Sequence, residues 1–160
     1  NISKLLFGKS SLYFIVFMIF GLFFATINFS VFGVIIRGNY FDLALLMALF
    51  IATILVFGML IGSFFKSKLF TFQVMVFSSY PIFLITGYSM PYQALPKLVQ
   101  IFSDMLPTTP FLKAYLSIVQ AGGSLADNLP SILHLTVLLL TFMVLCMLRF
   151  KFIINYKSGN

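Results

Sequence analysis

The sequence predicts an all-α integral membrane protein: four transmembrane helices plus an outer re-entrant or interfacial helix–break–helix before the last span. Three observations predict this fold class. Of the 160 residues, 61% are hydrophobic and only 8% are charged, whereas a soluble domain carries roughly 25% charged residues. Four segments stay apolar over the roughly 20 residues that a helix needs to cross a bilayer. Between the third and fourth segments, prolines interrupt a shorter stretch with the apolar period of a helix.

The chain is expected to form a single membrane domain, 1–160, and its four predicted spans cover 11–36, 41–65, 69–90 and 131–150. The first span has no charged residue, and the second has only Asp42, at its start. The third contains Pro81, which is expected to kink its helix because proline removes a backbone hydrogen bond.

No ionisable residue lies deep inside a span, which argues against ion-coupled pumps, intramembrane aspartyl proteases and voltage sensors. The sequence also lacks the metalloprotease, nucleophile-elbow and phosphate-loop motifs. We therefore expect no catalytic, cofactor or metal site in this chain, and no enzyme activity. His134 is interpreted as an interfacial residue and Cys146 as a small buried hydrophobe.

Charge placement predicts the orientation. One side of the membrane would hold seven basic residues and no acidic one: Lys4, Lys9, Lys66, Lys68, Arg149, Lys151 and Lys157. The other side would hold three of each sign: Arg37, Lys97, Lys113, Asp42, Asp104 and Asp127. Because cytoplasmic loops carry the excess of Lys and Arg, both termini are expected in the cytoplasm, with 151–160 as a cytoplasmic tail. The basic residues form no aromatic–basic patch, so no nucleic acid partner is expected. Asn1 in place of Met suggests a fragment or a processed product.

Residues 91–123 are then predicted to form an outer helical pair. From Leu95 to Leu106 the apolar residues recur with helical period, and Pro107 is expected to end this first helix. Thr109 is expected to cap the second helix, with Pro110 at its first position and Gly122-Gly123 after its last turn. Each helix is too short to span a bilayer. The pair either lies on the outer surface or re-enters the outer leaflet, and re-entry is favoured because a break at depth is tolerated where protein surrounds it.

Small and polar residues within the spans leave two interpretations open. Gly58 and Gly62 either admit a close helix neighbour or simply reflect the glycine content of membrane helices. Five polar residues either line a path for a substrate or form hydrogen bonds between helices: Thr26, Asn28, Ser30, Ser78 and Ser79. The second interpretation, a structural role, is favoured. A path without deep charges suits an apolar or amphipathic cargo.

Several motifs carry a family resemblance. The outer segment reads MPxxxLPxxxQxxSxxLPxTPFLKAY, followed by AGGSLADNLP, and the last span ends in LRFKF. This order resembles the C-terminal half of an ABC-2 type transporter permease, most closely over 69–151. NISKLLFGKS is similar to the family's cytoplasmic link before its third helix, and FFKSK, 64–68, to the link before its fifth.

The resemblance implies roles for two groups of residues. Residues 1–10 would form a cytoplasmic coupling segment that contacts an ATPase: Ser3, Lys4, Leu5, Gly8 and Lys9. The outer pair would form a re-entrant gate that closes the pathway: Pro91, Pro96, Leu106, Pro107, Thr109 and Pro110. The first two helices of the family would be absent.

The resemblance also implies a function: the membrane-spanning permease subunit of an ATP-driven ABC-2 type exporter, in the cell (inner) membrane. The chain itself would bind no cofactor, with ATP and Mg bound on a separate cytoplasmic ABC ATPase subunit. Its other partners would be a second permease half, in a homo- or heterodimer, and membrane lipid. The alternative is a passive pore or structural membrane subunit that is not coupled to ATP.

Overall fold

The computed structural model describes residues 2–31, 33, 36–65, 67–88 and 92–158, and within these ranges all regular structure is helical. The α-helices are α1 (Ile2–Val31), α2 (Tyr40–Gly62), α3 (Lys68–Ile85), α4 (Lys97–Asp104), α5 (Thr108–Leu116) and α6 (Leu129–Ser158). Three short helical turns accompany them: η1 (Tyr92–Ala94), η2 (Ser117–Ala121) and η3 (Ala126–Asn128).

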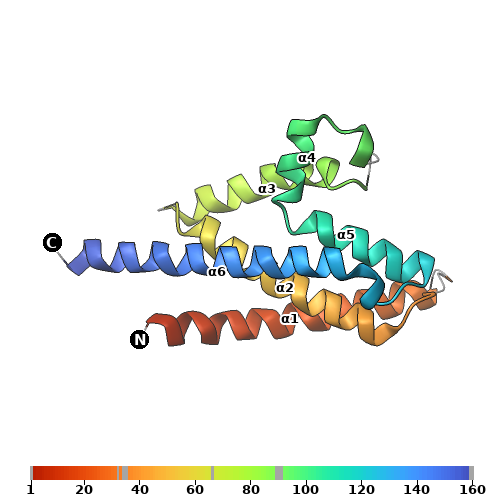
Figure 1. Ribbon diagram of the computed structural model, residues 1–160. Coiled ribbons are helices and arrows are strands. Elements are labelled where there is room, and N and C mark those ends of the chain that lie inside the picture. The colour runs from red at the N-terminus through yellow and green to blue at the C-terminus, as the bar shows by residue number, and fades with distance from the viewer. Residues whose placement is uncertain (1, 32, 34–35, 66, 89–91, 159–160) are drawn as a thin grey trace.

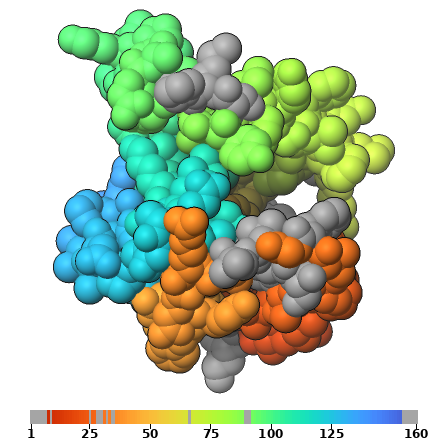
Figure 2. All heavy atoms as spheres, turned by 90° about the vertical axis from the view of Figure 1, so that its right-hand side faces the viewer, coloured from red at the N-terminus to blue at the C-terminus, as the bar shows by residue number. Residues whose placement is uncertain are grey.

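The long helices α1, α2 and α6 run side by side, and α3 and α4 stand to one side of them (Figure 1). α1 begins and α6 ends at the same end of this bundle. We call it the basic end, because Lys68 starts α3 there, and Arg149 and Lys151 lie in the last third of α6. At the opposite end, α5 lies in the middle, between α2 and α6 on one side and α3 and α4 on the other (Figure 2).

Three described helices are long and apolar enough to cross a membrane: Tyr40–Gly62, Lys68–Ile85 and Ala126–Ile153. A fourth apolar stretch, Ser10–Phe24 of α1, is shorter. These helices confirm the predicted all-α membrane class. Large apolar side chains also remain exposed along α1 and α3, as expected where lipid rather than water surrounds the helices.

Several helix ends differ from the predicted boundaries. α1 is continuous from Ile2, so the segment expected before the first span is part of the same helix. α3 ends at Ile85 rather than near residue 90, and Gly87 follows it with a φ of 96°. α6 continues to Ser158, so most of the expected tail is helical; no Gly or Pro interrupts it after Pro130. Pro81 lies inside α3, as expected.

The starts of α2 and α3 have side-chain caps. The Asn39 side chain accepts a hydrogen bond from the Phe41 N–H at the start of α2, and Ser67 accepts one from Phe70 at the start of α3. Both bonds satisfy amide groups that the first turn of a helix leaves without partners.

The main cluster of buried side chains lies towards the opposite end. Leu43 and Leu46 of α2 contact Ala114 of α5, Ile118 of η2 and Leu135 of α6 there, and each of these side chains is at most 2% exposed. Since lipid is as apolar as leucine, dispersion contacts rather than the hydrophobic effect hold these helices together. Close packing at this cluster therefore fixes where α5 lies.

A second buried cluster joins α2 to α6 nearer the basic end. Leu60, Phe142 and Cys146 form it, with the Phe57 and Phe142 ring centroids 4.9 Å apart. Burial of Cys146 among apolar side chains confirms its interpretation as a small hydrophobe.

The closest approach to a glycine of α1 or α2 is not at the predicted pair. A methyl group built on Gly21 of α1 would lie 3.3 Å from the Met47 Cε of α2. By contrast, a methyl group on Gly58 would meet only Met75, at 4.0 Å, and one on Gly62 would meet nothing within 4 Å among the described residues. Within the described residues, therefore, this pair has no close helix neighbour.

We predict that Gly38→Ala destabilises the protein. An added methyl group at Gly38 would lie 2.5 Å from the backbone oxygen of Ile118, so η2 would have to shift away from α2. Such overpacking costs about 1–3 kcal/mol, measurable as a lower thermal unfolding midpoint of the purified protein. The matched control is Gly62→Ala, which has open space and should cost nothing. An unchanged midpoint for Gly38→Ala would contradict the close contact.

Candidate functional site at the α4–α5 hinge

The helix–break–helix forms as predicted, but its second helix starts differently. α4 covers Lys97–Asp104 and α5 starts at Thr108, with Pro107 in the capping position and no side-chain cap bond. The prediction that Thr109 caps α5 is therefore wrong, and Pro110 is at the third helical position rather than the first. Proline is tolerated there because the first amides of a helix have no intrahelical partner. The turn closes with hydrogen bonds from Thr109 N–H to Leu106 O and from Phe111 N–H to Pro107 O.

The end of the second helix confirms its prediction. α5 continues through η2 to Ala121, and Gly122 follows with a φ of 73°, in the left-handed region that glycine tolerates. The Gly123 N–H donates to Ser117 O at 3.0 Å and closes the last turn.

α5 and η2 run antiparallel along one half of α2. The Phe111 ring stacks on Phe50, with centroids 3.9 Å apart and planes at 13°. Further on, Ile118 abuts Gly38, and the Arg37 N–H donates to Val119 O at 3.2 Å. Phe50 is 11 residues beyond the Asn39 cap, about 16 Å along a helix. The α4–α5 hinge, residues 105–107, thus lies about halfway along the bundle rather than at its end.

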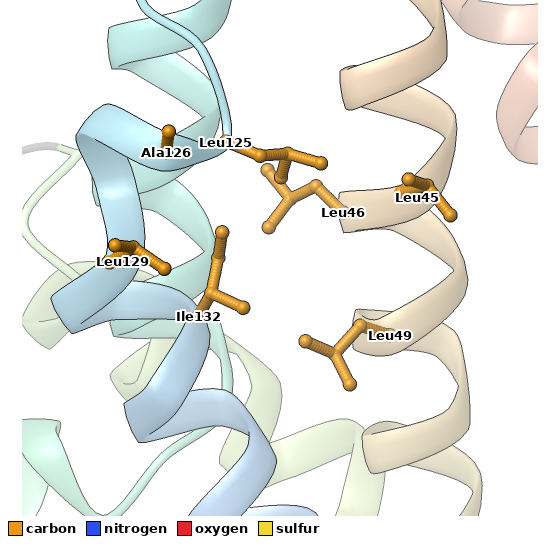
Figure 3. Close-up of a pocket in the computed structure, with 7 residues that line it drawn as sticks. All are labelled: Leu45, Leu46, Leu49, Leu125, Ala126, Leu129 and Ile132. Atoms are coloured by element: carbon orange, nitrogen blue, oxygen red, sulfur yellow. The ribbon is translucent and has the colours of Figure 1, made fainter.

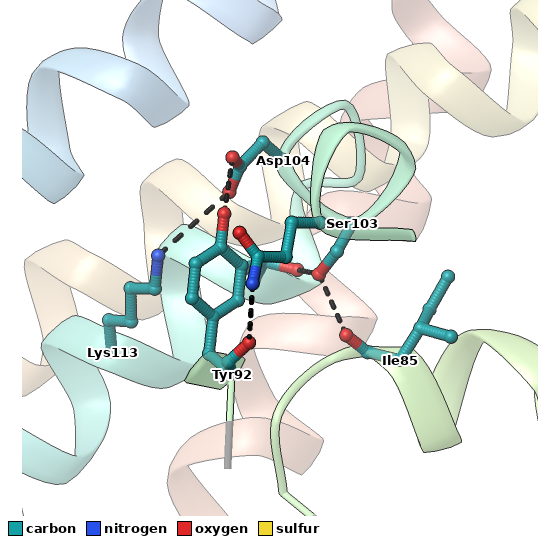
Figure 4. A network of polar contacts seen from close by, with 7 residues as sticks. Ile85, Tyr92, Ser103, Asp104 and Lys113 are labelled. Atoms are coloured by element: carbon teal, nitrogen blue, oxygen red, sulfur yellow. Dashed lines mark hydrogen bonds and ion pairs between the residues drawn. The ribbon is translucent and has the colours of Figure 1, made fainter. Parts of the chain in front are cut away.

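Buried hydroxyl groups hold the hinge against the end of α3 (Figure 4). Ser103 Oγ donates to Ile85 O at 2.7 Å and lies 2.8 Å from Thr109 Oγ1. Ser103 and Thr109 are both 0% exposed. Thr86 Oγ1 lies 3.3 Å from Thr108 Oγ1 in the same cluster. The cluster satisfies a carbonyl at the end of α3 that would otherwise have no partner away from water.

A second polar cluster ties η1 to both hinge helices. Tyr92 donates from its hydroxyl to the Asp104 carboxylate at 2.6 Å, and the Lys113 Nζ lies 3.9 Å from both that carboxylate and the Tyr92 ring centroid (Figure 4). The hydrogen bond to Asp104 is the main cause that raises the pKa of Tyr92. Gln100 Nε2 donates to the backbone oxygens of Tyr92 and Leu95. The exposed ion pair adds little energy by itself. The hydrogen bonds of Tyr92 and Gln100 therefore hold η1 against α4.

α4 turns its apolar side away from the protein. Leu98, Phe102 and Met105 are 74%, 66% and 61% exposed, whereas Ser103 of its polar side is buried. This is the reverse of the arrangement in a water-soluble protein, and it suits a helix with lipid on its outer face.

An apolar groove lies beside the helical hairpin that α4 and α5 form, between α2 and the start of α6 (Figure 3). Its volume is about 340 Å³, and its lining is Leu45, Leu46, Leu49, Leu125, Ala126, Leu129 and Ile132. The Asp42 carboxylate accepts a hydrogen bond from the Leu125 N–H at 3.2 Å and so fixes the turn that follows η2 to α2.

Most predicted gate residues lie at the hinge. Pro107, Thr109 and Pro110 are buried there, Leu106 is half-buried, and Pro96 is exposed at the start of α4. Pro91 lies outside the described residues. Their role as a gate stays a prediction.

The predicted coupling and pathway residues are only partly described. The predicted coupling residues all belong to the first turns of α1: Ser3, Lys4, Leu5, Gly8 and Lys9. Solvent exposure is described for only one of them, Gly8, and it is exposed. The side chains of Asn28 and Ser30 lie outside the described set. The hydroxyls of Thr26, Ser78 and Ser79 each donate to a carbonyl three or four residues earlier in their own helix, not across to another helix.

Sequence reasoning missed the residues that join the hinge to its surroundings. Tyr92, Ser103 and Thr86 act through contacts 12 to 22 residues away in sequence, which no local pattern reveals.

We predict that Ser103→Ala destabilises the hinge. It would leave Ile85 O without its hydroxyl donor and Thr109 without its 2.8 Å neighbour, at a cost of about 1–3 kcal/mol. The control, Ser79→Ala, removes an exposed hydroxyl that bonds only within α3. Thermal unfolding of both variants in lipid nanodiscs measures the difference. Equal midpoints would show that the buried hydroxyl cluster does not hold the hinge.

No curated protein and no solved structure matches the chain. A family model described as "ABC-2 family transporter protein" matches residues 1–148, which include every helix that forms the hinge and its surroundings. The chain therefore belongs to the ABC-2 family of transporter proteins and is a multi-pass membrane component of an ABC transporter.

Proposed function

We propose that this chain is the permease subunit of an ATP-driven exporter, that it forms part of the translocation path, and that a separate ATPase subunit drives it. Membership of the ABC-2 family supports the permease role. Coupling to ATP, export and pairing with a second permease half are what that family membership implies. The cytoplasmic location of both termini and the inner membrane are inferred from the seven basic residues predicted on one side.

The observation that carries the proposal is the helical hairpin in one half of the bundle. α5 and η2 pack against both α2 and α6, with Ala114 and Ile118 fully buried, and the hinge lies about halfway along α2. A hairpin in this position would block a path from the opposite end while leaving the basic end free of it. We infer that α4 and α5 form the outer gate of the path.

The basic end suits contact with an ATPase. α1 begins there against the end of α2, where Ser10 Oγ lies 3.3 Å from Met59 Sδ. A movement of the ATPase against the first turns of α1 would therefore be passed to α2, which carries α5 through the Phe50–Phe111 stack. In this scheme ATP and Mg act on the partner subunit, and this chain supplies the path and the moving helices.

The proposal predicts that charge reversal in the coupling segment uncouples the ATPase. The full-length protein, purified with its ATPase subunit and reconstituted in liposomes, should hydrolyse ATP. The double variant Lys4→Glu with Lys9→Glu should weaken binding of the ATPase subunit about tenfold, which corresponds to ~1.4 kcal/mol of binding free energy. The matched control also reverses two charges at the same end, Lys68→Glu with Lys151→Glu, but on α3 and α6. It should leave ATPase binding unchanged.

Two results would contradict the proposal. One is solute release from dye-filled liposomes by this protein without ATP, which would favour a passive pore. The other is equal ATPase binding by the coupling variant and the wild type, which would exclude the first turns of α1 as the contact.

A further inference from the structure

A second groove lies at the basic end, far from the hinge. It runs between the end of α2 and the last turns of the spanning part of α6, with a volume of about 320 Å³. Five apolar side chains and one cation line it: Leu60, Phe64, Leu145, Leu148, Phe152 and Arg149. The groove thus combines an apolar floor with a single guanidinium group.

Two aromatic rings hold the Arg149 guanidinium in place. Its Cζ lies 4.8 Å from the centroid of Phe64 and 5.9 Å from that of Phe152. Arginine stacks on aromatic faces in this way and keeps its N–H donors free for an anion. The Nε of Arg149 is buried, and no described residue accepts a hydrogen bond from it. A buried donor without a partner is costly, so the described part of the chain leaves the hydrogen-bonding capacity of Arg149 incomplete.

No acidic residue of this chain can pair with Arg149. The chain has three carboxylates, and each is engaged elsewhere: Asp42 with Leu125, Asp104 with Tyr92 and Asp127 with Ser124. The local potential therefore favours an anion from outside the chain.

The depth of Arg149 suits a lipid headgroup. α6 starts at Leu129, and 20 residues later Arg149 lies about 30 Å further along the helix, which is the thickness of the hydrocarbon core. Leu145 lies about one helical turn deeper than Arg149. The cation is thus at the boundary of the membrane, and the apolar part of the groove continues into it.

We propose that this groove is a binding site for an anionic phospholipid. The phosphate accepts hydrogen bonds from the Arg149 guanidinium, and one acyl chain lies against Leu60, Leu145 and Leu148. Basic pockets between membrane helices recognise anionic headgroups through this combination of charge and apolar contact. A free phosphate would satisfy the guanidinium but would leave the apolar floor uncovered.

The test compares Arg149→Gln with Lys151→Gln in the full-length protein. Both variants lose one positive charge at the same end, but Lys151 is exposed and does not line the groove. Each is purified, incorporated into nanodiscs of phosphatidylcholine with increasing phosphatidylglycerol, and melted; the midpoint against lipid fraction gives an apparent affinity. We expect the affinity for phosphatidylglycerol to fall about tenfold in Arg149→Gln, as loss of charged hydrogen bonds predicts, and to stay unchanged in Lys151→Gln.

Three results would overturn the proposal. The first is that phosphatidylglycerol stabilises Arg149→Gln as much as the wild type. The second is that Lys151→Gln loses as much affinity as Arg149→Gln. The third is that inorganic phosphate, added to pure phosphatidylcholine nanodiscs, reproduces the full effect, which would indicate a site for a free anion.

Arg149→Lys guards against a folding defect, because it keeps the charge and most of the packing. It should bind phosphatidylglycerol more tightly than Arg149→Gln does.

Discussion

The fold depends on one constraint: a helical hairpin that breaks halfway along a membrane bundle must satisfy its own backbone groups. Water and lipid cannot do this at depth, so the partners must come from the chain. At the α4–α5 break they are nearby. Thr109 and Phe111 donate to Leu106 and Pro107, and Ser103 donates to the last carbonyl of α3. Once these bonds are made, the break costs little, and α5 can lie against α2 while α4 packs against the end of α3.

The position of α5 follows from small residues as much as from large ones. Ala114 is fully buried among Leu43, Leu46 and Leu135, and Gly38 leaves room for the backbone of Ile118. In a membrane such close approaches supply the dispersion energy that the hydrophobic effect supplies in water. The two ends of the bundle then differ in kind. The hairpin fills one half, while the other end carries the surplus of positive charge and the first turns of α1, which suits contacts with an ATPase and with anionic lipid.

The sequence predicted the fold class because composition, hydropathy and proline spacing are local properties. It also predicted a break at Pro107 and an end at Gly122, since both depend on the backbone preferences of single residues. It did not predict the cap of α5, because Thr109 exchanges its local capping bond for Ser103, six residues earlier. The contacts that place the hinge, such as Phe50 with Phe111, join residues about 60 positions apart and leave no periodic signal. Arg149 was counted only as a charge; its position between two rings depends on where α2 ends.

Depth of the hinge is the central claim, and spin labels test it most directly. With Cys146 replaced by alanine, one label is attached at Met105, exposed beside the hinge, and another at Gln120, exposed near the opposite end. In liposomes, collision rates with oxygen, which concentrates in lipid, are compared with those of a water-soluble nickel chelate. The structure predicts that the label at Met105 favours oxygen and that the label at Gln120 favours the chelate. Equal access of the chelate to both positions would mean that the hairpin lies on the surface, and would contradict the account.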